Sequence, residues 1–155
     1  MTTLMDAFAT NERINQFLLE NLDAAAWRAE PPGGKGRTIA AIAAHIHNVR
    51  HMWLAVSATG TKFPDKVHRD KVTIPQARRA LAASAGAVIR LLESSLTSGR
   101  VKNAGMDPVA FFAYALSHEA HHRGQICLLA RQVGHPLSKE ATFAMWDWKK
   151  MALSS

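Results

Sequence analysis

Two histidines four residues apart are the residues of this chain best suited to chemistry. His118 and His122 stand within an apolar helical pattern that runs over about residues 107–133. Because residues i and i+4 share one face of an α-helix, both imidazoles can bind the same metal ion. A divalent transition metal usually takes at least three protein ligands, and a catalytic one keeps a further position open. The spacing therefore predicts a metal site that needs another ligand from elsewhere in the chain.

The elements that must position these side chains are helices. Apolar residues recur with a period near 3.6 over about residues 3–23, 38–57, 73–99 and 107–133, with turn-rich stretches between them and no alternating strand pattern. Thr38, Thr73 and Asp107 are suitable N-caps for the last three segments. Residues 138–151 carry enough aromatic residues for one short helix. We expect an all-α fold, an up-down-type four-helix bundle with a short C-terminal helix.

Helical geometry separates the histidines of the last long segment into inner and outer ones. At roughly 100° per residue, His118 and His122 lie in the middle of the apolar sector. His121 and Cys127 lie about 100° and 140° away from the centre of that sector, so we expect them on the outer face. The segment therefore contributes two metal ligands rather than three.

The second segment supplies the third candidate. His45 lies at the edge of its apolar sector and can turn into the bundle, whereas His47 and His51 lie on the opposite side, where a surface pair is expected. Three imidazoles buried together would leave polar nitrogens without partners unless something binds them, and one metal ion satisfies all three. The sequence predicts a metal site made by His45, His118 and His122.

The roles of the polar neighbours in the last long segment stay open. Glu119 could shuttle a proton, but an exposed ion pair with Arg123 one turn later is the favoured interpretation. Gln125 could orient a ligand imidazole or simply form a hydrogen bond in the core. Tyr114, one turn before His118, could place its hydroxyl near the site. Trp53, Trp146 and Trp148 are expected in the core or in the walls of the site.

Length and composition limit the class of protein. The 155 residues suffice for one domain, residues 1–155, and the single cysteine excludes an intrachain disulfide framework. The absence of a signal peptide and of a long apolar run predicts a cytoplasmic protein that does not enter membranes. Much of the net charge of +7 comes from residues 61–102. Without a nucleic-acid-binding motif, this predicts a solvated basic face, and we expect no nucleic-acid partner.

With these residues placed, nearly the whole chain resembles the DinB/YfiT-like family. His118–Ile126 matches the family's H-x-x-x-H-R-G-Q-I motif, Thr38–Ile46 is similar to its second-helix histidine segment, and Met145–Trp148 is similar to its aromatic tail. The resemblance implies a four-helix bundle, often a homodimer, with a divalent metal, commonly zinc or nickel. It places the metal ligands at His45, His118 and His122. Family members with known activity include transferases that use low-molecular-weight thiols, and hydrolases occur among relatives.

The functional prediction is a metal-dependent enzyme that acts on a small molecule, either a thiol-dependent S-transferase or a hydrolase. For a transferase, basic side chains between Lys62 and Arg79 are candidates for holding the carboxylates of the thiol. The alternative is a non-catalytic, metal-stabilised stress-response or binding module. Residues 118–122 also match the H-E-x-x-H pattern of zinc peptidases, but no downstream context of those enzymes follows. A peptidase is therefore disfavoured.

Overall fold

Four long helices form the protein. The computed structural model describes residues 3–58 and 60–153, in which the long helices are α1 (Leu4–Glu20), α2 (Ile39–Ser57), α3 (Ile74–Ser98) and α4 (Pro108–Gln132). Short 3₁₀ turns, η1 (Ala24–Ala26) and η2 (Pro32–Gly34), connect α1 to α2. Two short helices, α5 (Lys139–Ala144) and α6 (Trp148–Leu153), end the chain. The expected all-α bundle is confirmed, and the described residues contain no strand.

Local signals explain where the helices begin. The hydroxyl of Thr38 accepts a hydrogen bond from Ala41 N, and Thr73 forms a capping box with Gln76. The carboxylate of Asp107 accepts hydrogen bonds from two backbone amides of the first turn of α4. In the tail, Asp147 accepts a hydrogen bond from Lys150 N, which starts a new helix. The tail therefore forms two short helices where the sequence predicted one.

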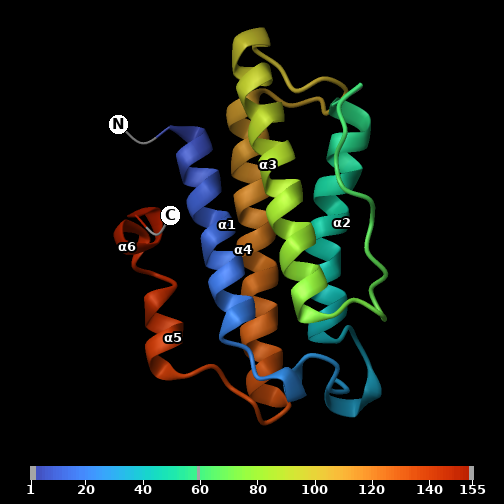
Figure 1. Ribbon diagram of the computed structural model, residues 1–155, viewed down its shortest axis with the longest axis vertical. Helices are drawn as coiled ribbons and strands as arrows, with labels where there is room; N and C mark the ends of the chain where they lie inside the picture. The colour runs from blue at the N-terminus through green and yellow to red at the C-terminus, as the bar shows by residue number, and fades with distance from the viewer. Residues whose placement is uncertain (1–2, 59, 154–155) are drawn as a thin grey trace.

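The helix directions follow from the long connection between α2 and α3. This segment returns along the bundle, so that α2 and α3 run in the same direction and α1 and α4 run together in the opposite direction (Figure 1). The packing agrees, because the end of α2 shares a core cluster with the end of α3 and with the beginnings of α1 and α4. As a result α2 and α4 are antiparallel neighbours, and their middle sections can face one another.

The apolar core is divided into two clusters by a polar layer. One cluster, at one end of the bundle, contains Phe8, Leu54, Leu92 and Phe111. The other cluster lies at the opposite end and includes Leu18, Ile39, Leu81 and Ile126. The residues between these positions on all four helices include buried polar and charged side chains, which are Asn11, Glu12, Asn15, Arg50, Ser84, Glu119 and His122. A buried polar layer of this extent requires partners for every charge.

The long connection covers a face of α2 that the sequence placed at the surface. His47 is completely buried, and its Nε2 lies 2.8 Å from the backbone oxygen of Asp65. Asn48 forms two hydrogen bonds with the backbone of Val67, both 3.0 Å long. His51 is half-buried and packs against the ring of Phe63. The prediction of a surface His47/His51 pair is therefore wrong, because periodicity within one helix cannot reveal a loop that lies on it.

Among residues 3–58 and 60–153, no helix combines the length and apolarity that crossing a lipid bilayer requires.

Candidate metal centre

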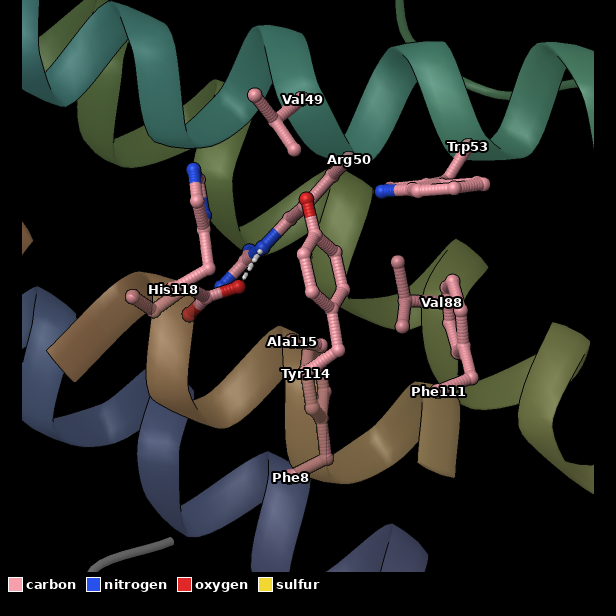
Figure 2. A pocket seen from close by; sticks show the side chains of 10 residues that line it. Phe8, Val49, Arg50, Trp53, Val88, Phe111, Tyr114, Ala115 and His118 are labelled. Carbon is pink, nitrogen blue, oxygen red and sulfur yellow. Dashed lines mark hydrogen bonds and ion pairs between the residues drawn. The ribbon is translucent and has the colours of Figure 1, made fainter. Parts of the chain in front are cut away.

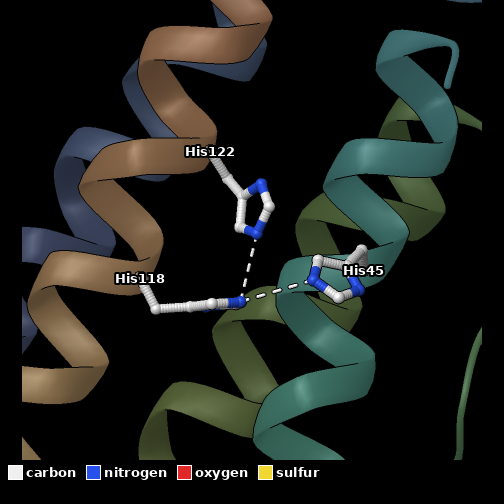
Figure 3. A group of neighbouring side chains, drawn as sticks. All are labelled: His45, His118 and His122. Atoms are coloured by element: carbon white, nitrogen blue, oxygen red, sulfur yellow. Dashed lines mark hydrogen bonds between the residues drawn. The ribbon is translucent and has the colours of Figure 1, made fainter. Parts of the chain in front are cut away.

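The structure brings the three predicted histidines together between α2 and α4. His118 Nε2 lies 3.3 Å from His45 Nε2 and 3.1 Å from His122 Nε2 (Figure 3). One nitrogen atom from each ring can be chosen so that all three lie within 4.8 Å of one another. His122 is buried, and the other two side chains are half-buried. We call these three side chains the histidine cluster, and they could hold a metal ion.

The donor set and its spacing fit a divalent metal. Zn–N bonds of about 2.0–2.1 Å in a tetrahedral site place neighbouring nitrogen atoms roughly 3.3 Å apart. The two short Nε2–Nε2 distances of 3.1 and 3.3 Å are close to that spacing. A neutral imidazole offers only one proton between its two nitrogens, so three converging Nε2 atoms cannot all satisfy each other by hydrogen bonds. A metal cation that accepts a lone pair from each of the three nitrogens resolves this conflict.

The surroundings keep the three imidazoles neutral. Burial lowers the pKa of His45 from 6.5 to about 4, with further contributions from His122 and from the cation of Arg37. Burial also lowers the pKa values of His118 and His122, and His122 lowers that of His118 further. Metal ligands must be deprotonated, so the shifts favour the ligand form of each ring near neutral pH.

A hydrogen-bond chain on α4 orients one ring of the cluster. Nδ1 of His122 lies 2.7 Å from Gln125 Oε1, and Gln125 Nε2 lies 2.9 Å from Nε2 of His121. If the amide oxygen accepts from Nδ1–H, the lone pair of His122 is left on Nε2, which faces the cluster. The predicted orienting role of Gln125 is the one that this geometry supports.

The two residues expected on the outer face of α4 lie outside the cluster. His121 is exposed and contacts the cluster through Gln125 and the edge of the His122 ring. Cys127 is half-buried at the margin of the apolar core, where burial raises the pKa of its thiol. Neither side chain is therefore a member of the histidine cluster.

Glu119 belongs to a second polar group, which the sequence did not predict. Its side chain is 1% exposed and accepts hydrogen bonds at both carboxylate oxygens: Oε1 from Arg50 Nε at 2.7 Å, and Oε2 from Arg50 Nη2 at 2.7 Å. Asn11 and Asn15 of α1 also donate to Oε2, at 2.6 and 2.8 Å. The favoured interpretation of Glu119 as an exposed partner of Arg123 is therefore wrong. Both of its oxygens are occupied, which also argues against a peptidase base or a proton shuttle.

Arg50 of α2 connects Glu119 to side chains and backbone of α1 and α3. Its guanidinium donates to Glu12 at 2.8 Å as well as to Glu119, and to the backbone oxygen of Leu81 at 2.8 Å. Burial opposes the charge of Arg50, but the two carboxylates outweigh it and raise its pKa. Burial opposes the charge of Glu119 as well, and Arg50 outweighs it, so the pKa of Glu119 is lowered.

The members of this second group come from all four long helices. Arg123 Nη1 donates to the amide oxygens of Asn11 and Asn15, at 2.6 and 2.8 Å. We call the group the ionic network, and its members are Asn11, Glu12, Asn15, Arg50, Ser84, Glu119 and Arg123. The only sign of this network in the sequence is that α1 and α2 carry acidic, amide and arginine residues within their helical pattern. Which of these side chains lie at the same height in the bundle depends on which helices are neighbours, and periodicity does not supply that information.

Of the three tryptophans expected in the core or in the walls of the site, one lies as predicted. Trp53 is half-buried beside His118 and so forms a wall of the site, as predicted. Trp146 and Trp148 are 77% and 39% exposed on the C-terminal tail, so their placement in the core or at the site was wrong. The basic connection lies over the His47 face of α2, and Arg37 is the cation outside the network that acts on both His45 and His122.

Of the comparisons with known proteins, the one with protein families found a match. No curated protein and no solved structure matches the chain. A family model does match, over residues 1–147, and this span includes all four long helices and every member of the histidine cluster. With the helical bundle and the three histidines in place, the chain belongs to the DinB family.

Proposed function

We propose that the histidine cluster binds one divalent metal ion, zinc or nickel, and that the protein is a metal-dependent enzyme acting on a small molecule. The observation that carries the proposal is the convergence of three neutral imidazole nitrogens from two helices. The reaction that this donor set supports best is thiol-dependent S-transfer or hydrolysis. A three-histidine site leaves a coordination position for a thiolate or a water.

The side chains of the site would have different roles in binding the metal and the reactant. His45, His118 and His122 would hold the metal through nitrogen lone pairs, and Gln125 would fix the orientation of the His122 ring. When bound, a divalent metal supplies a Lewis acid that lowers the pKa of a coordinated water or thiol to near neutrality. Arg37 adds positive charge near the cluster and favours an anionic reactant over a neutral one.

Access to the cluster supports a small-molecule reactant. His45 and His118 are half-buried, and Tyr114 and Gln125, which flank them on α4, are exposed. Solvent therefore reaches the part of the site beside the rings of His45 and His118. By contrast, the ionic network is closed, and its charges are already paired within the protein.

We also propose that two copies of the chain associate through the C-terminal tail. Phe143 and Trp146 are 65% and 77% exposed, and Leu128 of α4 is 57% exposed. Large apolar side chains that remain exposed are typical of protein interfaces. Size-exclusion chromatography with light scattering tests this proposal: the native chain should elute as a dimer and Trp146→Ser as a monomer, and a native monomer would contradict it.

Turnover and ligand exchange test the enzymatic proposal. Protein loaded separately with Zn²⁺, Ni²⁺ or Mn²⁺ should support reaction of a thiol with an electrophile or hydrolysis of an ester, and the metal-free protein should not. His122→Ala should be inactive, whereas His135→Ala, a histidine outside the cluster, should retain activity. If the metal binds but neither thiol nor cyanide enters its coordination shell, the ion only ties α2 to α4, and the non-catalytic module is correct.

A further inference from the structure

A small cavity adjoins the histidine cluster on its side toward the Phe8 end of the bundle. Trp53 of α2 and Tyr114 of α4 face it, and His118 forms part of its wall (Figure 2). The cavity offers about 10 Å³ to the centre of a water molecule, which is room for roughly one water-sized group. Most of the remaining wall is apolar, from Phe8, Val49, Val88, Phe111 and Ala115.

The indole nitrogen of Trp53 lies at this cavity without a protein partner. Nε1 is buried, and it makes no hydrogen bond with any of the described residues. The ring itself is held firmly, because it packs edge-on against Phe111 and Tyr114, with centroid distances of 5.7 and 5.6 Å. A buried N–H that makes no hydrogen bond costs about 1–3 kcal/mol, so such a donor is normally paired.

Trp27 shows what a purely structural tryptophan looks like in this protein. It is 4% exposed, and its Nε1 donates to the backbone oxygen of Val72 at 2.9 Å. The two indoles are both packed by apolar neighbours, but only that of Trp53 faces a cavity beside the histidines. The donor of Trp27 is therefore satisfied within the protein, whereas that of Trp53 is not satisfied by any described residue.

Tyr114 connects the cavity to the cluster. Its ring stacks on that of His118, with centroids 5.9 Å apart and an angle of 23° between the planes. Its hydroxyl end points from α4 toward α2, into the region between His118 and Trp53 (Figure 2). A group that occupies the cavity would therefore meet an indole N–H and a phenolic hydroxyl while lying next to a cluster imidazole.

The charged side chains at the cavity are not available to such a group. Arg50 and Glu119 contribute to the wall, but their charges are paired with each other at 2.7 Å and with other members of the ionic network. The free hydrogen-bonding capacity therefore belongs to two neutral groups, the indole N–H of Trp53 and the hydroxyl of Tyr114. The indole N–H can only donate, so it selects an oxygen acceptor.

We propose that this cavity is an oxygen subsite, in which Trp53 Nε1–H donates to a carbonyl or carboxylate oxygen of the small molecule bound at the histidine cluster. Trp53 is then a specificity-determining residue, and Tyr114 closes the subsite against solvent. The inference rests on the proposed function, since it places the rest of the reactant on the metal side. It adds a substrate class: small molecules that carry an oxygen acceptor close to the atom that binds the metal.

A pair of probe thiols tests the subsite. Mercaptoacetate and ethanethiol share the thiol and the methylene carbon next to it, but only mercaptoacetate carries carboxylate oxygens. Their affinities can be measured on the cobalt-loaded protein from its visible absorption. Trp53→Phe removes the N–H and keeps an aromatic ring, and it should lower the affinity for mercaptoacetate by about tenfold, the scale of one hydrogen bond to a charged group. The affinity for ethanethiol should stay unchanged in this variant, and Trp146→Phe should change neither affinity.

A second measurement uses the unaltered protein. The chain has four tryptophans, so its indole N–H signals can be resolved by ¹H–¹⁵N NMR on the zinc form. Mercaptoacetate should move the Trp53 signal downfield, and ethanethiol should not. Equal responses to the two thiols in both measurements would overturn the subsite while leaving the metal proposal intact. Failure to bind cobalt or zinc would overturn the proposed function, and the subsite with it.

Discussion

The histidine cluster and the ionic network are neighbours on the same helices, yet they handle buried polarity in opposite ways. His118 precedes Glu119, and His122 precedes Arg123, so each pair sends one side chain to each group. In the ionic network, both oxygens of Glu119 and three nitrogens of Arg50 have partners within the protein. In the cluster, three nitrogens of the same kind face one another. The closed group is suited to stabilising the bundle, and the open group to binding something from outside.

The largest expected effect on stability comes from removing the buried cation of the ionic network. Arg50→Met keeps much of the side-chain volume but leaves the carboxylates of Glu12 and Glu119 buried without their cation. Breaking a buried ion pair in this way costs about 3–5 kcal/mol in the free energy of unfolding, measurable by urea denaturation. Arg78→Met, which breaks a half-exposed pair with Glu20, is the control and should cost no more than about 1 kcal/mol. Equal losses in the two variants would show that the ionic network is not the anchor of the fold.

The next effect concerns the open group, which should stabilise the fold only when it is filled. Zinc at about 100 times its dissociation constant should raise the free energy of unfolding by about 2.7 kcal/mol. His118→Ala should fold without metal and gain nothing from zinc, because two imidazoles remain. Thermal denaturation with and without zinc measures both values. Equal zinc stabilisation of the variant would place the metal elsewhere.

Lowering the pH should affect the histidine cluster before it affects the ionic network. The pKa of His45 is lowered from 6.5 to about 4, so between these values the unfolded chain binds protons that the folded metal-free chain does not. The stability of the metal-free protein should therefore fall as the pH decreases from about 6.5 to about 4, and zinc should be released in the same interval. The pKa of Glu119 is lowered, so its contribution persists below the ordinary range of a glutamate.

The measurement is zinc content and urea denaturation at several pH values between 7 and 4. Near pH 5, the protein should be losing its metal while the bundle is still folded. Zinc retained in full at pH 4, or unfolding that precedes metal release, would contradict this order.

The smallest effect should come from the residue that orients His122. Gln125→Leu removes the acceptor for Nδ1 and lets the ring rotate. Loss of such a partner typically lowers metal affinity by about 10–100-fold. Because Gln125 is exposed, we expect the metal affinity to fall by about tenfold, the lower end of this range. Competition with a chromogenic chelator measures the affinity. His121→Ala, which removes only the next member of the chain, should have a smaller effect, and the reverse order would refute the orienting role.

The sequence predicted the helices and the inner histidines because both depend on local periodicity. Thr38, Thr73 and Asp107 cap helices as expected, and the i,i+4 spacing of His118 and His122 brings their nitrogens to 3.1 Å. His45 required only the further assumption that its helix packs beside the last one. These features are set by one helix or by one pair of helices, which is why residue spacing was sufficient.

The ionic network, the burial of His47 and the exposed tail could not be predicted in the same way. Asn11 and Asn15 resemble ordinary polar helix residues until α1 is placed against α4. His47 is covered by a loop whose path no periodicity encodes. Trp146 looks like a core residue from its type alone, but it lies between the two short helices of the tail and is 77% exposed. Each failure concerns packing between segments that are distant in the chain.

The most direct test of the central claim is the metal content of the purified protein after dialysis against a trace of free zinc. Elemental analysis should find one zinc ion per chain in the native protein and none in His122→Ala, with circular dichroism showing the same helical content in both. Zinc bound equally by the two proteins, or by neither, would contradict a metal centre at His45, His118 and His122.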